Sequence, residues 1–116
     1  MEGYFKYGCP IVKIEIQDNM EEVVLDSGFN GQLMLPRKLI VKLKLKHIGY
    51  SDYLSADGEE VITKMYEVTV KLFGESMKIE ALSTESDLAL AGMELLHDYK
   101  IVIERSKDKV EISETK

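Results

Sequence analysis

Short runs of β-branched and other apolar residues, separated by turn-forming residues, constrain the fold of this chain more than any other feature. The first two runs cover residues 11–16 and 23–25, with a polar break at Asp18-Asn19 between them, and predict two strands joined by a tight turn. The next segment, residues 27–31, is rich in residues that tolerate sharp turns or positive φ. We therefore expect Asp26 at the junction between a strand and a loop.

Two further hairpins are predicted in the middle of the chain. Residues 50–72 contain two extended segments around Ala56-Asp57-Gly58-Glu59, and an Asp-Gly pair between such segments is a strong hairpin signal. In the second hairpin, residues 66–73 turn through Gly74-Glu75-Ser76 into residues 77–82. Strands should therefore dominate this region.

A helix is expected between the first hairpin and the second. Leu33-Met34-Leu35 is a short apolar run, and Pro36 suits the first position of a helix covering residues 37–45. The alternation of lysines with apolar residues over 41–46 would by itself indicate a strand. Pro36 decides in favour of the helix.

The last third of the chain predicts a strand, a short helix and another strand. Residues 88–92 are small and apolar, residues 93–98 have helical spacing, and Ile101-Val102-Ile103 is typical of a strand. The mostly charged tail, residues 105–116, leaves room for one last edge strand around Val110 and Ile112. With 116 residues the chain is expected to form a single, mainly β domain.

Composition excludes several classes of partner. The chain has 15 Lys+Arg against 21 Asp+Glu, and this net negative charge repels nucleic-acid phosphates. No apolar run approaches the roughly 20 residues of a membrane span, and residues 1–7 do not resemble an export signal. Cys9 is the only cysteine, so no disulfide can form within the chain. A cytoplasmic location without nucleic-acid or membrane partners is therefore expected.

The apolar strand that ends in Asp26-Ser27-Gly28 provides what an aspartic peptidase needs. Its catalytic carboxylate must be held at the end of a strand, facing a second carboxylate, by a loop with little side-chain bulk. A polar β-turn is the alternative, and the tripeptide alone favours that alternative. The motifs elsewhere in the chain change this balance.

Several segments, taken in order, resemble the stand-alone prokaryotic members of the retropepsin-like (clan AA) aspartic peptidases. They are residues 26–31, Leu35-Pro36, the hairpin that carries Gly58, and the hydrophobic-hydrophobic-Gly segment with its continuation, residues 90–96. The resemblance covers residues 11–104 within the single domain 1–116. It implies an acid-protease barrel with one or two short helices that is active as a two-fold homodimer.

The same resemblance assigns roles to individual residues. Asp26 would be the catalytic carboxylate, with Ser27 and Gly28 in the active-site loop. The substrate would be a peptide or protein, bound by two groups of residues: Phe29, Asn30 and Gly31 of the loop, and Ala56, Asp57 and Gly58 of the hairpin that forms the flap. No metal or organic cofactor is needed, and the separations of Cys9, His47 and His97 match no zinc motif.

Three positions depart from the family pattern. Ser27 replaces the more common Thr but still offers the hydroxyl that cross-braces the two active-site loops in the family. The flap carries one glycine where a glycine-rich tip is usual. Met93 stands where the viral enzymes have a basic residue, which argues against a viral style of dimer brace at that position.

A second copy of the chain is expected to complete the site. Asp52, Asp57, Asp87 and Asp98 are not followed by Ser/Thr-Gly, so none of them is the second catalytic aspartate. The first hypothesis is an aspartic endopeptidase whose Asp dyad is shared across a homodimer. The alternative is a catalytically silent module of the same fold that binds a partner peptide as an added strand.

Overall fold

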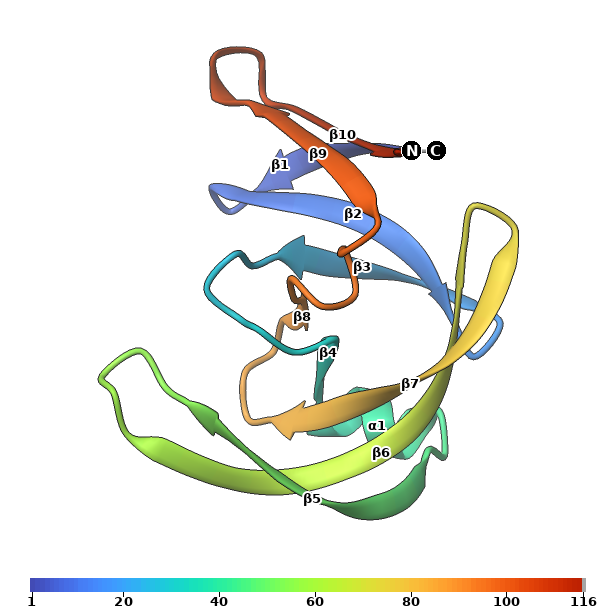
Figure 1. Cartoon of the computed structure of the whole chain (residues 1–116), viewed down its shortest axis with the longest axis vertical. Coiled ribbons are helices and arrows are strands. Elements are labelled where there is room, and N and C mark those ends of the chain that lie inside the picture. Colours follow the sequence, from blue (N-terminus) through green and yellow to red (C-terminus); the bar gives the residue numbers. More distant parts are fainter. Residues whose placement is uncertain (116) are drawn as a thin grey trace.

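The computed structural model describes residues 1–115, which form ten strands, one α-helix and one 3₁₀ turn (Figure 1). The prediction of a mainly β fold is confirmed. The strands are β1 (Glu2–Lys6), β2 (Cys9–Ile16), β3 (Asn19–Leu25), β4 (Leu33–Pro36), β5 (Lys46–Leu54), β6 (Glu60–Leu72), β7 (Glu75–Thr84), β8 (Ala89–Ala91), β9 (Tyr99–Glu104) and β10 (Lys109–Glu114). The helix is α1 (Arg37–Lys42) and the 3₁₀ turn is η1 (Arg105–Lys107).

The strands form one sheet that curls back on itself. Their order is β5-β6-β7-β4-β8-β3-β2-β1-β10-β9, and β2 makes an additional antiparallel pairing with β6 at Ile16 and Val70. In Figure 1 the long strands β6 and β7 curve around the lower and right-hand sides of the molecule toward β2. The enclosed core is apolar, and no polar or charged side chain is buried among residues 1–115.

The predicted hairpins are confirmed, and their turns lie slightly earlier than expected. The turn between β2 and β3 is at Gln17 and Asp18, with φ of 50° and 66°. The turn between β6 and β7 is at Phe73 and Gly74, with φ of 50° and 81°. Positive φ at both central residues is the turn geometry that matches the twist of paired strands, and it fixes each hairpin's register.

Helix α1 is confirmed, but it is shorter than predicted. Pro36 ends β4 and precedes the helix, which stops at Lys42. Ile40 is its one buried residue, while Val41 is 70% exposed. Lys44 has a positive φ of 52°, and the chain enters β5 at Lys46. The period-two pattern over residues 41–46 therefore runs from the end of the helix through a turn to the first residue of β5.

The short helix predicted over residues 93–98 is wrong, because this segment is a series of turns. Its backbone N–H groups form hydrogen bonds with the loop after β3 instead of within the segment. Those of Met93 and Glu94 donate to the carbonyls of Phe29 and Gly31, at 2.9 and 3.1 Å. Leu95 and Leu96 are buried. Tertiary contacts with the loop after β3 therefore decide the conformation of this segment, and not its helical spacing.

The prediction of a last edge strand is also wrong, because β10 lies between β1 and β9. Val110 and Ile112 are buried in the main core. Strand β1, which the sequence analysis did not predict, supplies the neighbour that makes β10 internal. Glycine is required in β1, since a Cβ on Gly3 would lie 2.1 Å from the carbonyl oxygen of Ile11. Lys116, the last residue of the predicted tail, lies outside the described residues.

No helix within residues 1–115 has the length and apolar character needed to cross a membrane.

Replacing Ile112 with Ala should lower the free energy of unfolding by about 2–5 kcal/mol, because the side chain is buried in the core and its removal leaves a cavity. Urea unfolding at a fixed protein concentration measures the change. Val41→Ala, at an exposed position, should change stability by less than about 0.5 kcal/mol. Equal effects of the two substitutions would show that β10 is not part of the core.

Candidate active site

A groove of about 870 Å³ separates the loop after β3 from the β5–β6 hairpin, which we call the flap. Its floor is a small apolar cluster, separate from the main core, made by Phe29, Met34 and Leu82. Tyr53 and Met65, which project from the inner face of the flap, pack against this cluster together with Leu90. The flap therefore covers the loop through a few apolar side chains.

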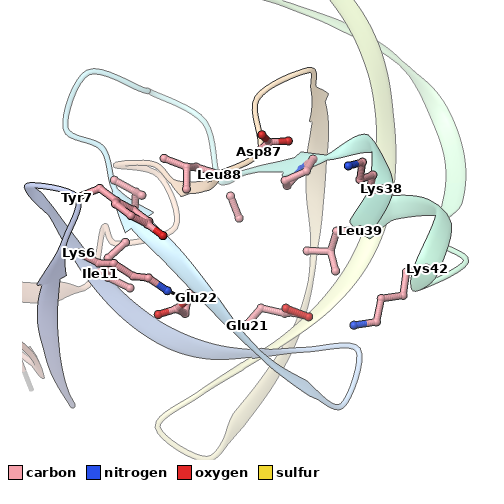
Figure 2. A pocket seen from close by; sticks show the side chains of 13 residues that line it. Lys6, Tyr7, Ile11, Glu21, Glu22, Lys38, Leu39, Lys42, Asp87 and Leu88 are labelled. Atoms are coloured by element: carbon pink, nitrogen blue, oxygen red, sulfur yellow. Dashed lines mark hydrogen bonds and ion pairs between the residues drawn. The ribbon is translucent and has the colours of Figure 1, made fainter.

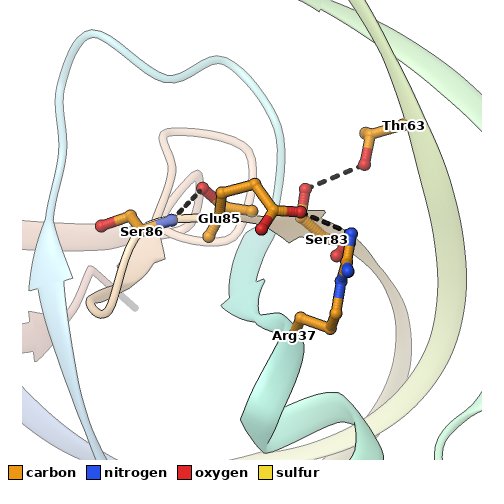
Figure 3. Close-up of polar contacts among 6 residues, drawn as sticks. Arg37, Thr63, Ser83, Glu85 and Ser86 are labelled. Carbon is orange, nitrogen blue, oxygen red and sulfur yellow. Dashed lines mark hydrogen bonds and ion pairs between the residues drawn. The ribbon is translucent and has the colours of Figure 1, made fainter.

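Polar contacts attach the flap and α1 to the sheet beside the groove (Figure 3). The Thr63 hydroxyl donates a hydrogen bond to the carbonyl of Ser83 at 2.9 Å, joining β6 to the end of β7. Arg37, at the start of α1, forms an exposed ion pair of 2.5 Å with Glu85. Exposed pairs of this kind contribute little to stability, so the Thr63 hydrogen bond is the stronger of these two contacts, next to the backbone pairing of β6 with β7 that begins at Met65 and Leu82.

Asp26 directly follows β3 and projects into the groove. Strand β3 pairs in parallel with β8, where Leu25 is aligned with Ala91, and the Asp26 N–H donates to the Ala91 carbonyl at 3.0 Å. The carboxylate oxygen Oδ1 accepts a hydrogen bond from the Gly28 N–H at 2.9 Å. The half-buried carboxylate is thus held by one oxygen.

Space requires glycine at position 92, close to this carboxylate, and is tighter there than at position 28. A Cβ on Gly92 would lie 2.2 Å from the carbonyl oxygen of Gly31 and 2.6 Å from the ring of Phe29. A Cβ on Gly28 would lie 3.3 Å from Asp26 Oδ1. The glycines of the loop and Gly92 do not have positive φ. The predicted loop after β3 is confirmed, it forms without positive φ, and close approach of backbones is the reason for glycine at position 92.

Comparison with solved structures identifies the architecture. The EIAV protease in complex with the inhibitor HBY-793 is 25% identical, with a TM-score of 0.66 over 82% of this chain and 91% of that chain. A retropepsin-like aspartic protease from Rickettsia conorii is 23% identical, with a TM-score of 0.68 over 95% of this chain and 86% of that chain. The chain has a retropepsin-like fold.

A third structure supports the same conclusion. The protease of Simian Foamy Virus (mac) is 20% identical, with a TM-score of 0.58 over 75% of this chain and 91% of that chain. No protein-family model matches the sequence, and a search of curated proteins finds no relative. The assignment therefore rests on three-dimensional likeness, which agrees with the resemblance found in the motifs.

The retropepsin-like fold brings most of the predicted site residues together at the groove. Five of them line it from the loop and one lines it from the flap. These residues are Asp26, Gly28, Phe29, Asn30, Gly31 and Ala56. Ser27 is exposed and does not line the groove.

Asp57 and Gly58 lie at the flap tip, outside the lining of the groove, and shape the turn there. The Asp57 carboxylate accepts hydrogen bonds from the Ser55 hydroxyl and the Glu59 N–H. Both bonds lower the pKa of Asp57, and the bond from the Ser55 hydroxyl has the larger effect. The N–H of Gly58 donates to the Ser55 carbonyl at 3.0 Å, and its φ is 84°. A left-handed glycine is typical of such three-residue hairpin loops.

The sequence analysis missed two acidic residues in the groove, Glu80 and Glu94. The Glu80 N–H donates to the side-chain oxygen of Gln32 at 3.0 Å, and the Glu94 N–H donates to the Gly31 carbonyl at 3.1 Å. The alternation of Glu80 with buried Ile79 and Ala81 signals only that it faces away from the core. The other charged residues that line the groove, Asp26 and Asp52, are also acidic, although the Asp52 side chain lies on the outer face of the flap.

A second cavity, of about 370 Å³, lies between the β1–β2 hairpin, β3 and α1 (Figure 2). Its rim carries both signs of charge, with Lys38 and Lys42 across from Glu21 and Glu22. Glu22 accepts hydrogen bonds from the Tyr4 hydroxyl and from Lys6, and these bonds lower its pKa. Because Glu22, one of the acids of this second cavity, is already paired and Asp26 does not line the cavity, the groove is the better candidate for the active site.

Within residues 1–115 no group of three or more His, Cys, Asp or Glu side chains is arranged to hold a metal ion.

The flap carries a pair of carboxyl groups on its outer face. Asp52 is aligned with Ile62 and Leu54 with Glu60, which makes Asp52 and Glu60 diagonal neighbours on one face of the hairpin. The pKa of Glu60 is raised mainly by its hydrogen bond with Asp52 and, to a smaller extent, by the negative charge of Asp52. The pair therefore retains a proton more readily than two isolated carboxyl groups do.

Replacing Gly92 with Ala should unfold the chain or strongly destabilise it, because the added methyl group would overlap the Gly31 carbonyl oxygen. Gly28→Ala is the matched comparison, since its methyl group would meet only one oxygen, at 3.3 Å. Thermal unfolding of both variants measures the difference. A Gly92→Ala variant as stable as Gly28→Ala would contradict the close approach described here.

The Asp52–Glu60 pair should make the flap less stable as the pH rises. The pKa of Glu60 is higher in the folded protein than in the unfolded chain. Protonated Glu60 therefore stabilises the fold fully at pH values below its pKa in the unfolded chain, and this stabilisation is lost as the pH rises through its pKa in the folded protein. Glu60→Gln removes one charge and should slow amide exchange at the flap tip near neutral pH. Hydrogen exchange, corrected for intrinsic rates, measures this effect. Unchanged protection in the variant would show that the pair does not act on the flap.

Proposed function

We propose that the chain is an aspartic endopeptidase whose active site forms when two copies place their Asp26 side chains face to face. The observation that carries this proposal is the position of Asp26. It stands at the end of β3, in a groove beneath a hairpin, held by β8 and by the Gly28 N–H. The likeness to solved aspartic proteases supports peptide-bond hydrolysis as the chemistry.

The dyad follows from electrostatics. Two carboxylates a few ångströms apart cannot both be ionised at low cost, so the pair retains one proton and titrates as a unit. The groove of one chain offers a single Asp-Ser-Gly carboxylate. A symmetric partner is the simplest source of the second, because a two-fold axis places identical groups opposite each other.

The proposed reaction uses a water molecule held between the two carboxyl groups. The ionised Asp26 takes a proton from the water while the water oxygen bonds to the peptide carbonyl carbon, and the protonated Asp26 of the partner subunit donates its proton to the carbonyl oxygen. The resulting diol then loses the amine. The C–N bond breaks, the nitrogen receives the proton that one Asp26 took from the water, and a diol hydroxyl returns its proton to the other carboxylate. A carboxylic acid and an amine are released, and the dyad again holds one proton.

The substrate is proposed to lie along the groove as an extended peptide. Phe29, Asn30, Gly31 and Ala56 are the predicted substrate-binding residues that line it. The floor of Phe29, Met34 and Leu82 suits apolar side chains, and the acidic lining favours peptides that carry basic groups. Asp57 and Gly58 are proposed to act through the shape of the flap tip, and Ser27 through a cross-brace between the two loops.

Asp26→Asn should abolish cleavage without unfolding the protein, because an amide neither shares the proton nor acts as the base. Mass spectrometry of a peptide library, read from acidic to neutral pH, measures activity. Asp87→Asn, at an exposed position outside the groove, is the matched control and should remain active. Stability of Asp26→Asn should be equal to that of the parent or slightly higher, since a source of like-charge repulsion is removed.

Mixing experiments test whether the dyad is shared. After subunit exchange between equal amounts of parent and Asp26→Asn, about half of the parent subunits should be in inactive mixed dimers, so activity per parent subunit should fall to about one half. Activity that stays unchanged on mixing would contradict a shared dyad. Activity of the pure Asp26→Asn variant would exclude Asp26 as the catalyst. A folded parent that binds library peptides without cleaving them would favour the peptide-binding module.

A further inference from the structure

Two acidic residues reach the groove on either side of the start of β4. Leu33, the first residue of β4, is aligned with Ala81 of β7 on one side and with Ala91 of β8 on the other. Glu80 directly precedes Ala81, and Glu94 follows Ala91 after two further residues. Both glutamates line the groove. Two carboxyl groups from different parts of the chain therefore flank the same short stretch of backbone.

Gln32, the half-buried residue before β4, lies between these two glutamates and also lines the groove. Its backbone carbonyl accepts a hydrogen bond from the Gly92 N–H at 2.9 Å, and its side-chain oxygen Oε1 accepts one from the Glu80 N–H at 3.0 Å. Because a backbone N–H can face only an acceptor, the second bond fixes which side-chain atom is the oxygen and which is the nitrogen. The orientation of the Gln32 amide group is therefore set by the fold.

The amide nitrogen of Gln32, Nε2, is left available to a molecule in the groove. Among residues 1–115 no protein group accepts a hydrogen bond from Nε2, and no buried side-chain nitrogen or oxygen lacks a partner. An unpaired Nε2 must therefore be accessible. Its N–H groups are suited to donate to a carbonyl oxygen, which is the acceptor that a peptide backbone offers.

The carboxyl groups of Glu80 and Glu94 have no cationic partner in the described part of the chain. Neither takes part in an ion pair, and no basic residue lines the groove. In the second cavity, by contrast, Glu22 is paired with Lys6 at 3.0 Å. A cleft lined by charges of one sign concentrates the opposite charge. Both glutamates are exposed, so their attraction for a cation is moderate.

We infer that Gln32, Glu80 and Glu94 form a subsite of the groove that binds a lysine or arginine side chain of the substrate. This assignment rests on the proposed function, because it requires that the groove hold a peptide. The two carboxylates bind the cationic head of the side chain, and Gln32 Nε2 donates to a carbonyl oxygen of the peptide backbone beside it. Successive side chains of an extended peptide point to opposite faces, so the basic residue is preferred at one fixed distance from the scissile bond.

Cleavage of a peptide library tests the subsite. Peptides cut by the parent should be enriched in Lys and Arg at a single position. A matched peptide with norleucine at that position, which has a similar length without the charge, should be cut less efficiently. We expect the ratio of kcat/KM for the lysine and norleucine peptides to be roughly three to ten, because the carboxylates are exposed, and to fall as the salt concentration rises.

Removing the two charges tests which residues act. Glu80→Gln and Glu94→Gln should each lower this ratio by about two- to threefold, mainly by raising KM for the lysine peptide, and the double variant should bring it close to one. Reversing both charges, with Glu80→Lys and Glu94→Lys together, should favour a peptide with Glu at the same position. Asp87→Asn removes a negative charge outside the groove and should leave the ratio unchanged.

Two variants of Gln32 separate its two contacts. Gln32→Glu keeps an acceptor for the Glu80 N–H but loses the Nε2 donors, so KM should rise for both peptides while their ratio does not fall. Gln32→Leu loses the acceptor as well, so the ratio should also fall, because Glu80 is no longer held beside β4. A fall of the ratio in Gln32→Glu equal to that in Gln32→Leu would contradict this division. If thermal unfolding shows that Gln32→Leu does not fold, the glutamate variants and Gln32→Glu decide.

The outcomes distinguish failure of the subsite from failure of the proposed function. If the parent cleaves peptides in an Asp26-dependent way without preferring Lys or Arg at any position, or if the preference survives in the double glutamine variant, the subsite is wrong and the proposed function stands. If the parent cleaves nothing, the proposed function fails, and fluorescence anisotropy of matched lysine and norleucine peptide libraries decides the subsite. Tighter binding of the lysine library by the parent, lost in the double variant, supports it, and equal binding overturns it.

Discussion

The close contact between the segment after β8 and the loop after β3 is the constraint on which the candidate site depends. Asp26 and Gly92 are 66 residues apart in the sequence, yet their backbones meet at the ends of two parallel strands. The hydrogen bonds from Gly92 to Gln32 and from Met93 to Phe29, both at 2.9 Å, hold the loop against β8. Any side chain at position 92 would occupy the space of the Gly31 carbonyl, so this contact is possible only with glycine. The orientation of the Asp26 carboxylate follows from it.

Sequence patterns predicted the parts of this protein that depend on local interactions. The β2–β3, β5–β6 and β6–β7 hairpins were predictable because turn residues and alternating apolar residues specify them within about 20 residues of chain. Residues 93–98 have helical spacing, but their backbone binds a loop that is distant in the sequence, and no local pattern reveals this. The internal position of β10 was not predictable for a related reason. It depends on β1, which lies at the other end of the chain.

The candidate site shows the same division. The motif around Asp26 and its resemblance to a known family identified the loop, because a strand followed by Asp-Ser-Gly is a local feature. Glu80 and Glu94 could not be identified, since they reach the groove only through the hydrogen bonds that join their backbones to Gln32 and Gly31.

The separation of the groove floor from the main core has a consequence for how a peptide enters. Strand β6 is paired with β7 from Met65 onward, but the outer part of the flap, residues 50–64, contacts the rest of the molecule mainly through Tyr53 and the Thr63 hydroxyl, and its outer face leaves Leu54 and Ile62 each 74% exposed. Lifting this outer part would therefore break a few contacts with the cluster of Phe29, Met34 and Leu82 and would leave the core around Ile16, Leu33 and Val70 intact. Local opening of this kind costs less free energy than global unfolding. An edge hairpin that rests on a small cluster of its own is thus suited to admit a peptide without loosening the strands that hold Asp26.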